Sequence, residues 1–216
     1  MTASSNEESG AGLSKHRLEA LGDAIFAFAM TLLVLDVKIP KIPGAVASPE
    51  LLTRAMLDLW PKFVSYFTSF VVLGVFWIAH TGYFHFVKRT DRWFLWINLL
   101  FLMFVVFVPF STDVLGDYPM HRVPVTIYGC NIMAIQLALF LQWRYATKGR
   151  RLVGSDLEPE LVCRANRRIL MGICTYACAV LLAWLSPTVS LILFVLVPIM
   201  YILPSRVDYH WMHSHG

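Results

Sequence analysis

The chain alternates between long apolar runs and short polar connections. Six runs, over residues 18–37, 63–79, 93–110, 123–143, 169–185 and 189–203, have the length of membrane-spanning helices, because a helix needs about 20 predominantly apolar residues to cross a bilayer. The last run is short and contains Pro198, so we expect it to be kinked or to stop before the far side. Only residues 186–188 separate the last two runs, which is typical of a tight helical hairpin.

Composition agrees with a membrane protein. Hydrophobic residues make up 57% of the 216 residues and charged residues only 15%, whereas soluble domains average about 25% charged residues. The predicted fold class is therefore all-α: an integral membrane protein with six transmembrane helices over residues 15–205. Residues 1–14 are polar and lack the apolar segment of a secretory signal, which predicts a disordered N-terminal tail.

The distribution of lysine and arginine predicts the orientation. An even number of spans places both termini on one side of the membrane, and thirteen of the 18 basic residues fall on that side against five on the other. Cytoplasmic segments carry such an excess, so both termini are expected to be cytoplasmic, and the protein is expected to be a multi-pass protein of the cell membrane. The same bias accounts for the net charge of +4, and no nucleic-acid partner is implied.

The first span differs from the others because it carries Arg17, Glu19 and Asp23 in or near its first turns. Charge at membrane depth is costly and usually marks a pathway or a structural pairing. At about 100° per residue, one face of this helix groups Phe28 with Arg17, Leu21, Ala24, Thr31, Leu32 and Leu35. Asp23 lies about 140° away from Phe28, so we expect a buried carboxylate on the opposite face.

Candidate partners for that carboxylate lie in the next two spans. Trp77 and His80 are at the cytoplasmic end of the second span, and Asn98 is in the third, at a similar depth. An indole N–H, an imidazole and a carboxamide all donate hydrogen bonds to carboxylates. We therefore predict a structural polar network of Arg17, Asp23, Trp77, His80 and Asn98 that holds the first span in place. The alternative for His80 is an interfacial histidine without a partner.

Residues 17–23 resemble the signature of the transmembrane protein 175 potassium channel family, which is found in lysosomes and in bacteria. That signature has an arginine, three further residues, Phe-Ser-Asp and then an apolar run. Arg17 and Asp23 match it, whereas Leu21 and Gly22 replace the phenylalanine and serine. The run TLLVLDVKIP, over residues 31–40, is also similar to the family. A second similar stretch contains Tyr66, Ser69, Phe70, Trp77, His80, Asp91, Trp96, Asn98, Leu99, Leu100, Phe101, Pro109 and Phe110. The second half of the chain matches only in hydropathy.

The resemblance implies a potassium-permeable cation channel whose pore is lined by the first transmembrane helix. It implies a hydrophobic constriction and no re-entrant selectivity loop. Carried over by position, the constriction consists of Phe28, Thr31, Leu32 and Leu35, with Phe28 replacing the isoleucine that is usual in the family. Single-repeat members of the family assemble as homotetramers, so the expected partners are K⁺, the lipid bilayer and three further copies of the chain. Na⁺ and H⁺ are alternative permeant ions.

Other readings of the chain stay open. Asp36, near the outer end of the first span, is expected to concentrate cations in a vestibule; its alternative is a simple interfacial charge. The chief functional alternative is a secondary transporter of a small ion or solute, although such proteins often show inverted repeats and none is evident here. A passive structural protein is a further alternative.

An enzyme is not expected, because the chain contains no nucleophile elbow, P-loop or zinc-protease motif. No cofactor or metal site is expected either. His210, His213 and His215 are read as part of a His-rich cytoplasmic tail over residues 206–216, with a terminal metal site as the alternative.

Overall fold

The computed structural model describes residues 15–35, 37–38, 48–155 and 157–202. The expected tails over residues 1–14 and 206–216 and the vestibule residue Asp36 lie outside these ranges. Within them the elements are α1 (Lys15–Leu35), α2 (Pro49–Leu57), α3 (Trp60–Phe86), α4 (Arg92–Val106), α5 (Val108–Asp117), α6 (Arg122–Thr147), the 3-10 turn η1 (Lys148–Arg150), α7 (Pro159–Ala183) and α8 (Pro187–Ile202).

The all-helical membrane class is confirmed. In the described part of the chain five helical stretches are long and apolar enough to cross a membrane: Lys15–Leu35, Pro49–Phe86, Arg92–Asp117, Arg122–Arg150 and Pro159–Ala183. The sixth predicted span corresponds to Pro187–Pro198, which is apolar but shorter.

Two predicted boundaries were wrong. The second span continues as helix to Phe86 rather than stopping at residue 79, because polar residues in its last turns end the apolar run without ending the helix. The third span is divided into α4 and α5 at Phe107, and Pro109 lies in the first turn of α5. A proline ring has no N–H to donate and clashes with the preceding turn, so the helix breaks there.

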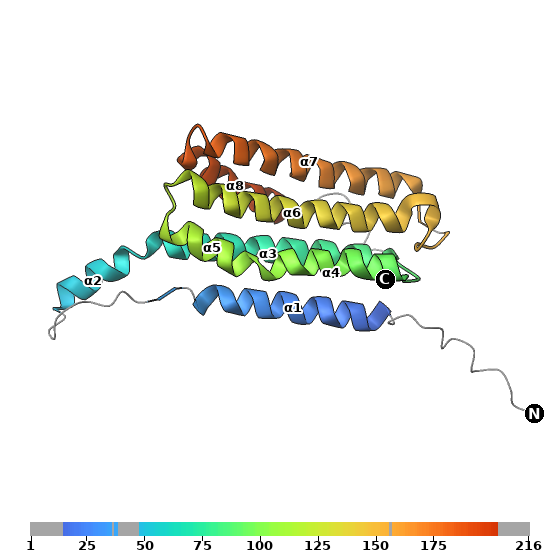
Figure 1. Cartoon of the computed structure of the whole chain (residues 1–216), viewed down its shortest axis with the longest axis horizontal. Helices are drawn as coiled ribbons and strands as arrows, with labels where there is room; N and C mark the ends of the chain where they lie inside the picture. The colour runs from blue at the N-terminus through green and yellow to red at the C-terminus, as the bar shows by residue number, and fades with distance from the viewer. Residues whose placement is uncertain (1–14, 36, 39–47, 156, 203–216) are drawn as a thin grey trace, which may run out of the picture.

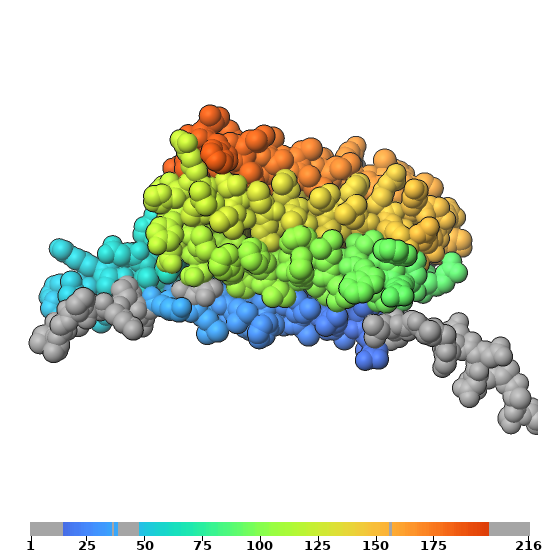
Figure 2. Space-filling model, in the orientation of Figure 1, coloured from blue at the N-terminus to red at the C-terminus, as the bar shows by residue number. Residues whose placement is uncertain are grey.

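The helices stack in layers between two opposite edges (Figure 1). Helix α1 lies along one edge and packs on α3, α4 and α5, while α7 lies along the opposite edge and packs on α6 and α8. In the space-filling view α1 forms a strip along the border of the molecule (Figure 2). The first span is therefore a peripheral helix of this subunit rather than a central one.

Helix α1 attaches to its neighbours by a single stripe of buried residues: Leu18, Gly22, Phe26, Ala29 and Leu33. These positions recur every three or four residues, so they share one helix face. At Gly22 the approach is especially close, because a Cβ atom there would lie 3.1 Å from Cε1 of His80. The missing side chain lets α1 rest directly against the imidazole ring of α3.

Small residues also bring the second half of the bundle together. A Cβ atom on Gly129 of α6 would lie 2.5 Å from Cγ2 of Val180 in α7 and 2.6 Å from Cζ of Phe194 in α8. Both distances are shorter than any ordinary contact, so a side chain at this position would force Val180 and Phe194 to shift. Small residues are enriched where membrane helices pack closely, and Gly129 is such a point for three helices.

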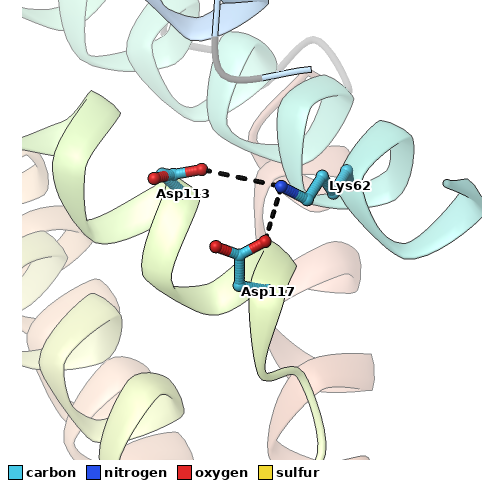
Figure 3. A network of polar contacts seen from close by, with 3 residues as sticks. All are labelled: Lys62, Asp113 and Asp117. Carbon is cyan, nitrogen blue, oxygen red and sulfur yellow. Dashed lines mark ion pairs between the residues drawn. The ribbon is translucent and has the colours of Figure 1, made fainter. Parts of the chain in front are cut away.

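Ion pairs connect the first turn of α3 with α5. Nζ of Lys62 lies 3.9 Å from Oδ1 of Asp113 and 2.5 Å from Oδ1 of Asp117 (Figure 3). Deeper in the bundle, Thr112 donates to Ser69 over 2.8 Å, and Ser69 donates to the hydroxyl of Tyr128 in α6 over 3.1 Å. Internal hydrogen bonds of this kind satisfy groups that hydrocarbon cannot.

Candidate functional site

The face of α1 that the helical wheel groups around Phe28 is uncovered in the subunit. Phe28 is 59% exposed and Leu35 is 63% exposed. Thr31 is also exposed, whereas Leu32 is half-buried at the edge of the face. An exposed apolar face on a membrane helix meets either lipid or other copies of the chain.

Thr31 provides the hydroxyl on this face. Its Oγ1 donates to the backbone carbonyl of Phe28 over 2.7 Å. Because the proton is used within the helix, the oxygen lone pairs of Thr31 are free to accept from water or to face a cation. The face therefore combines large apolar side chains with one acceptor group, and Asp36 beyond it lies outside the described residues.

The structure brings Asp23 together with Trp77. The indole N–H of Trp77 donates to Oδ1 of Asp23 over 2.8 Å, which links α1 to α3. The expectation of a buried Asp23 is wrong for the single subunit, because the residue is exposed. Asp23 follows Gly22 of the buried stripe and is rotated about 100° from it around the helix axis. Its carboxylate therefore contacts α3 from the side of α1.

His80 and Asn98 form a second, fully buried contact. Nε2 of His80 lies 3.0 Å from Oδ1 of Asn98, and that oxygen also accepts from Nε2 of Gln142 over 2.8 Å. A carboxamide oxygen only accepts, so Nε2 of His80 carries the proton and its Nδ1 is the bare nitrogen. The His80 ring stacks on Phe101 at 4.9 Å between centroids. These contacts join α3, α4 and α6 directly behind Gly22.

Sequence reasoning missed Gln142. A glutamine inside the apolar run of residues 123–143 was a usable signal, because an amide in hydrocarbon needs a partner. The predicted network is thus two neighbouring contacts, Asp23–Trp77 and His80–Asn98–Gln142. Arg17 belongs to neither: it is exposed, and it makes no hydrogen bond or ion pair with the described residues.

A polar cavity of about 230 Å³ lies between the first turns of α1 and the last turns of α3. Its lining consists of His16, Glu19, Ala20, Asp23, His80 and Thr81. Among the described residues no group of three or more His, Cys, Asp or Glu side chains has an arrangement that would hold a metal ion. The cavity lies beside the contact of α1 with α3, and most of its lining side chains are polar.

The fold and this site define an integral membrane protein of helices whose peripheral first helix presents an unpartnered apolar face. A family model described as the endosomal/lysosomal potassium channel TMEM175 matches residues 17–109. That range contains both contacts of α1 with α3 and the uncovered face.

Relatives extend the match over most of the chain. A potassium channel of Chamaesiphon minutus is 34% identical over 186 residues, which cover 82% of this chain and 90% of that protein. The human endosomal/lysosomal proton channel TMEM175 is 31% identical over 183 residues, which cover 81% of this chain and 36% of the human protein. The crystal structure of a lysosomal potassium-selective channel TMEM175 homolog from Chamaesiphon minutus superposes with a TM-score of 0.78 at 32% identity, covering 88% of this chain and 96% of that one. This chain belongs to the TMEM175 family.

Proposed function

We propose that this protein is a potassium-permeable cation channel of the cell membrane. Relatives over most of its length are named potassium channels, and a solved homologue is described as potassium-selective. K⁺ is therefore the proposed permeant ion. Na⁺ and H⁺ are the alternatives, since the human relative is named a proton channel. The excess of basic residues on the side of the termini supports cytoplasmic N- and C-termini.

The observation that carries this proposal is the uncovered face of α1. The helix lies at the edge of the subunit (Figure 1), with Phe28 and Leu35 pointing away from the bundle. One copy of one helix cannot enclose a pore, whereas four copies arranged around an axis can. The proposed assembly is accordingly a homotetramer in which these faces meet around the ion pathway, with no re-entrant loop.

The proposed constriction consists of Phe28, Thr31 and Leu35, with Leu32 at its edge. Rings of apolar side chains gate by excluding water from a narrow pore, and the faces of aromatic rings attract cations. Phe28 is the bulkiest of these side chains and forms the narrowest point of the proposed pore. The oxygen of Thr31, whose proton is bonded to the Phe28 carbonyl at 2.7 Å, offers an acceptor to a cation one turn further along.

The contacts behind α1 are proposed to keep this face aimed at the axis. The Asp23–Trp77 bond holds the flank of the helix, and the close approach of Gly22 to His80 holds its buried side. Asp36 is proposed to concentrate cations at the outer mouth of the pore. The effect of Asp36 should weaken as ionic strength rises, because salt screens exposed charges.

Planar bilayers test the channel proposal. Purified protein under a K⁺/Na⁺ bi-ionic gradient should give discrete single-channel openings and a reversal potential displaced toward K⁺. Saturable flux coupled to a second gradient, without unitary openings, would support the secondary transporter instead.

Two alanine substitutions on α1, with a matched alanine substitution on α7 as the control, test the pore lining. Phe28→Ala and Leu35→Ala should raise the cation conductance, because each removes side-chain volume from the proposed pore. Leu181→Ala on α7 is the control: Leu181 is 70% exposed but lies on the helix at the opposite edge. Unchanged conductance in Phe28→Ala, or an equal rise in Leu181→Ala, would contradict the assignment of the pore to α1.

A further inference from the structure

The two helices of the C-terminal hairpin differ in length. Helix α7 has 25 residues and α8 has 16, so they extend over about 37 Å and about 24 Å respectively. They are joined at the end where α7 stops and α8 starts, so the first turns of α7 extend beyond Ile202, the last described residue of α8. A groove of about 560 Å³ runs along α7, lined by residues of one helix face from Cys163 to Thr175.

This α7 groove changes character along its length. Asn166 and Arg167 lie at the end of the groove nearer the start of α7. Leu170, Met171 and Cys174 follow toward the middle of the helix. The side chains of Leu170 and Met171 are largely exposed. The groove thus has a polar, cationic end and an apolar remainder. A phospholipid has the same order of polarity, because its headgroup is polar and its acyl chains are apolar.

Two polar groups at the head of the groove lack partners within the described chain. Arg167 is exposed and makes no hydrogen bond or ion pair with described residues, whereas its neighbour Arg164 is paired with Glu160 over 2.9 Å. Oδ1 of Asn166 is buried and accepts no hydrogen bond. That oxygen is shielded from a ligand on the surface, so the group open to a ligand is the Arg167 guanidinium, which a negative charge would satisfy.

We propose that the α7 groove binds an anionic phospholipid such as phosphatidylglycerol. The Arg167 guanidinium pairs with the lipid phosphate, as guanidinium groups do in bidentate contacts. One acyl chain lies over Leu170 and Met171, which are exposed on the same helix face. Helix α7 is at the edge opposite α1 (Figure 1), so a tetramer built around α1 leaves this groove facing the bilayer.

Native mass spectrometry of the purified 216-residue protein tests this site. The wild type, Arg167→Gln and the control Arg144→Gln are each titrated with phosphatidylglycerol and with phosphatidylcholine. Arg144 is an exposed cation of α6 that does not line the groove. Loss of Arg167 should weaken phosphatidylglycerol binding about fivefold, which is the contribution of one basic residue at a lipid surface. Arg144→Gln should bind as the wild type does, and phosphatidylcholine should bind weakly to all three proteins.

Cysteine labelling provides an independent readout in the same samples. Cys163 and Cys174 line the groove, whereas Cys130 is exposed on α6 outside it. Phosphatidylglycerol should slow maleimide labelling of Cys163 and Cys174 relative to Cys130, and Arg167→Gln should abolish that protection.

Three results would overturn the proposal. The first is equal binding of the two lipids by the wild type. The second is unchanged phosphatidylglycerol binding in Arg167→Gln. The third is binding that appears only after deletion of residues 203–216, which would make that segment the occupant of the groove. None of these results depends on ion conduction, so failure of this site and failure of the channel proposal are separable.

Discussion

Replacing Asn98 by leucine tests how α3, α4 and α6 are held together behind the first helix. Oδ1 of Asn98 accepts from both His80 and Gln142, at 3.0 and 2.8 Å, and the residue is completely buried. Asn98→Leu keeps the size of the side chain but removes both bonds and leaves two buried donors without an acceptor. Gln142→Leu removes only one of the bonds and leaves the His80–Asn98 contact intact.

The expected magnitudes follow from the number of bonds. Hydrogen bonds between membrane helices average about 0.6 kcal/mol and reach about 1.7 kcal/mol. Asn98→Leu should therefore lower the free energy of unfolding by about 1–3 kcal/mol, and Gln142→Leu by about half as much. The double variant should lose little more than Asn98→Leu alone, because the Gln142 bond is already absent once Asn98 is replaced.

Unfolding in mixed micelles by a denaturing detergent, followed by tryptophan fluorescence, measures these differences. Leu99→Ala serves as a control, since Leu99 neighbours Asn98 on α4 but is exposed. Equal losses in Asn98→Leu and Gln142→Leu would refute the reasoning. Additive losses in the double variant would also refute it, because the two residues would then be acting independently.

Three further changes test other contacts by the same assay. Gly129→Ala should destabilise the protein by about 1–3 kcal/mol through overpacking. Gly74→Ala is the control and should be neutral or stabilising, because the nearest atom is 4.0 Å from its Cβ position. Similar losses of stability in both variants would contradict the close packing at Gly129. Trp77→Phe should lower stability by up to about 1.7 kcal/mol because it removes the donor to Asp23, and stability equal to the wild type would exclude a role for that bond. Lys62→Met should cost at most about 1 kcal/mol, since the pair is partly exposed, and the difference from wild type should shrink at high salt; a loss independent of salt would point to packing instead.

The sequence indicated the faces of the first helix because helical periodicity is a local property. The stripe of Leu18, Gly22, Phe26, Ala29 and Leu33 is buried and the Phe28 face is exposed, and both follow from 3.6 residues per turn. Periodicity does not state how far a neighbouring helix lies from a given side chain. The exposure of Asp23 therefore could not be derived from the wheel. The separate position of Arg17 could, because the wheel places Arg17 on the exposed Phe28 face and away from Asp23.

The polar partners were predictable in kind and only partly in identity. Trp77, His80 and Asn98 stood out as polar groups within apolar spans at one depth, and two contacts with these groups are present. Gln142 comes from a span whose depth and rotation relative to Asn98 are set by the packing of α6 on α4. A pairing between helices depends on that packing, which no single-helix pattern encodes.

The departure from the family signature at Gly22 has a physical meaning in this fold. A serine at this position would place its Cβ 3.1 Å from Cε1 of His80, so the imidazole would have to shift by a few tenths of an ångström. That imidazole is not free to move, because it is bonded to Asn98 and stacked on Phe101. Glycine at position 22 therefore fits a His80 ring that does not move. The ring is held by Asn98 of α4, whose oxygen also accepts from Gln142 of α6, and α1 packs against the ring. Phe28 lies less than two turns from that contact, so we expect the orientation of the proposed constriction to depend on residues outside the proposed pore.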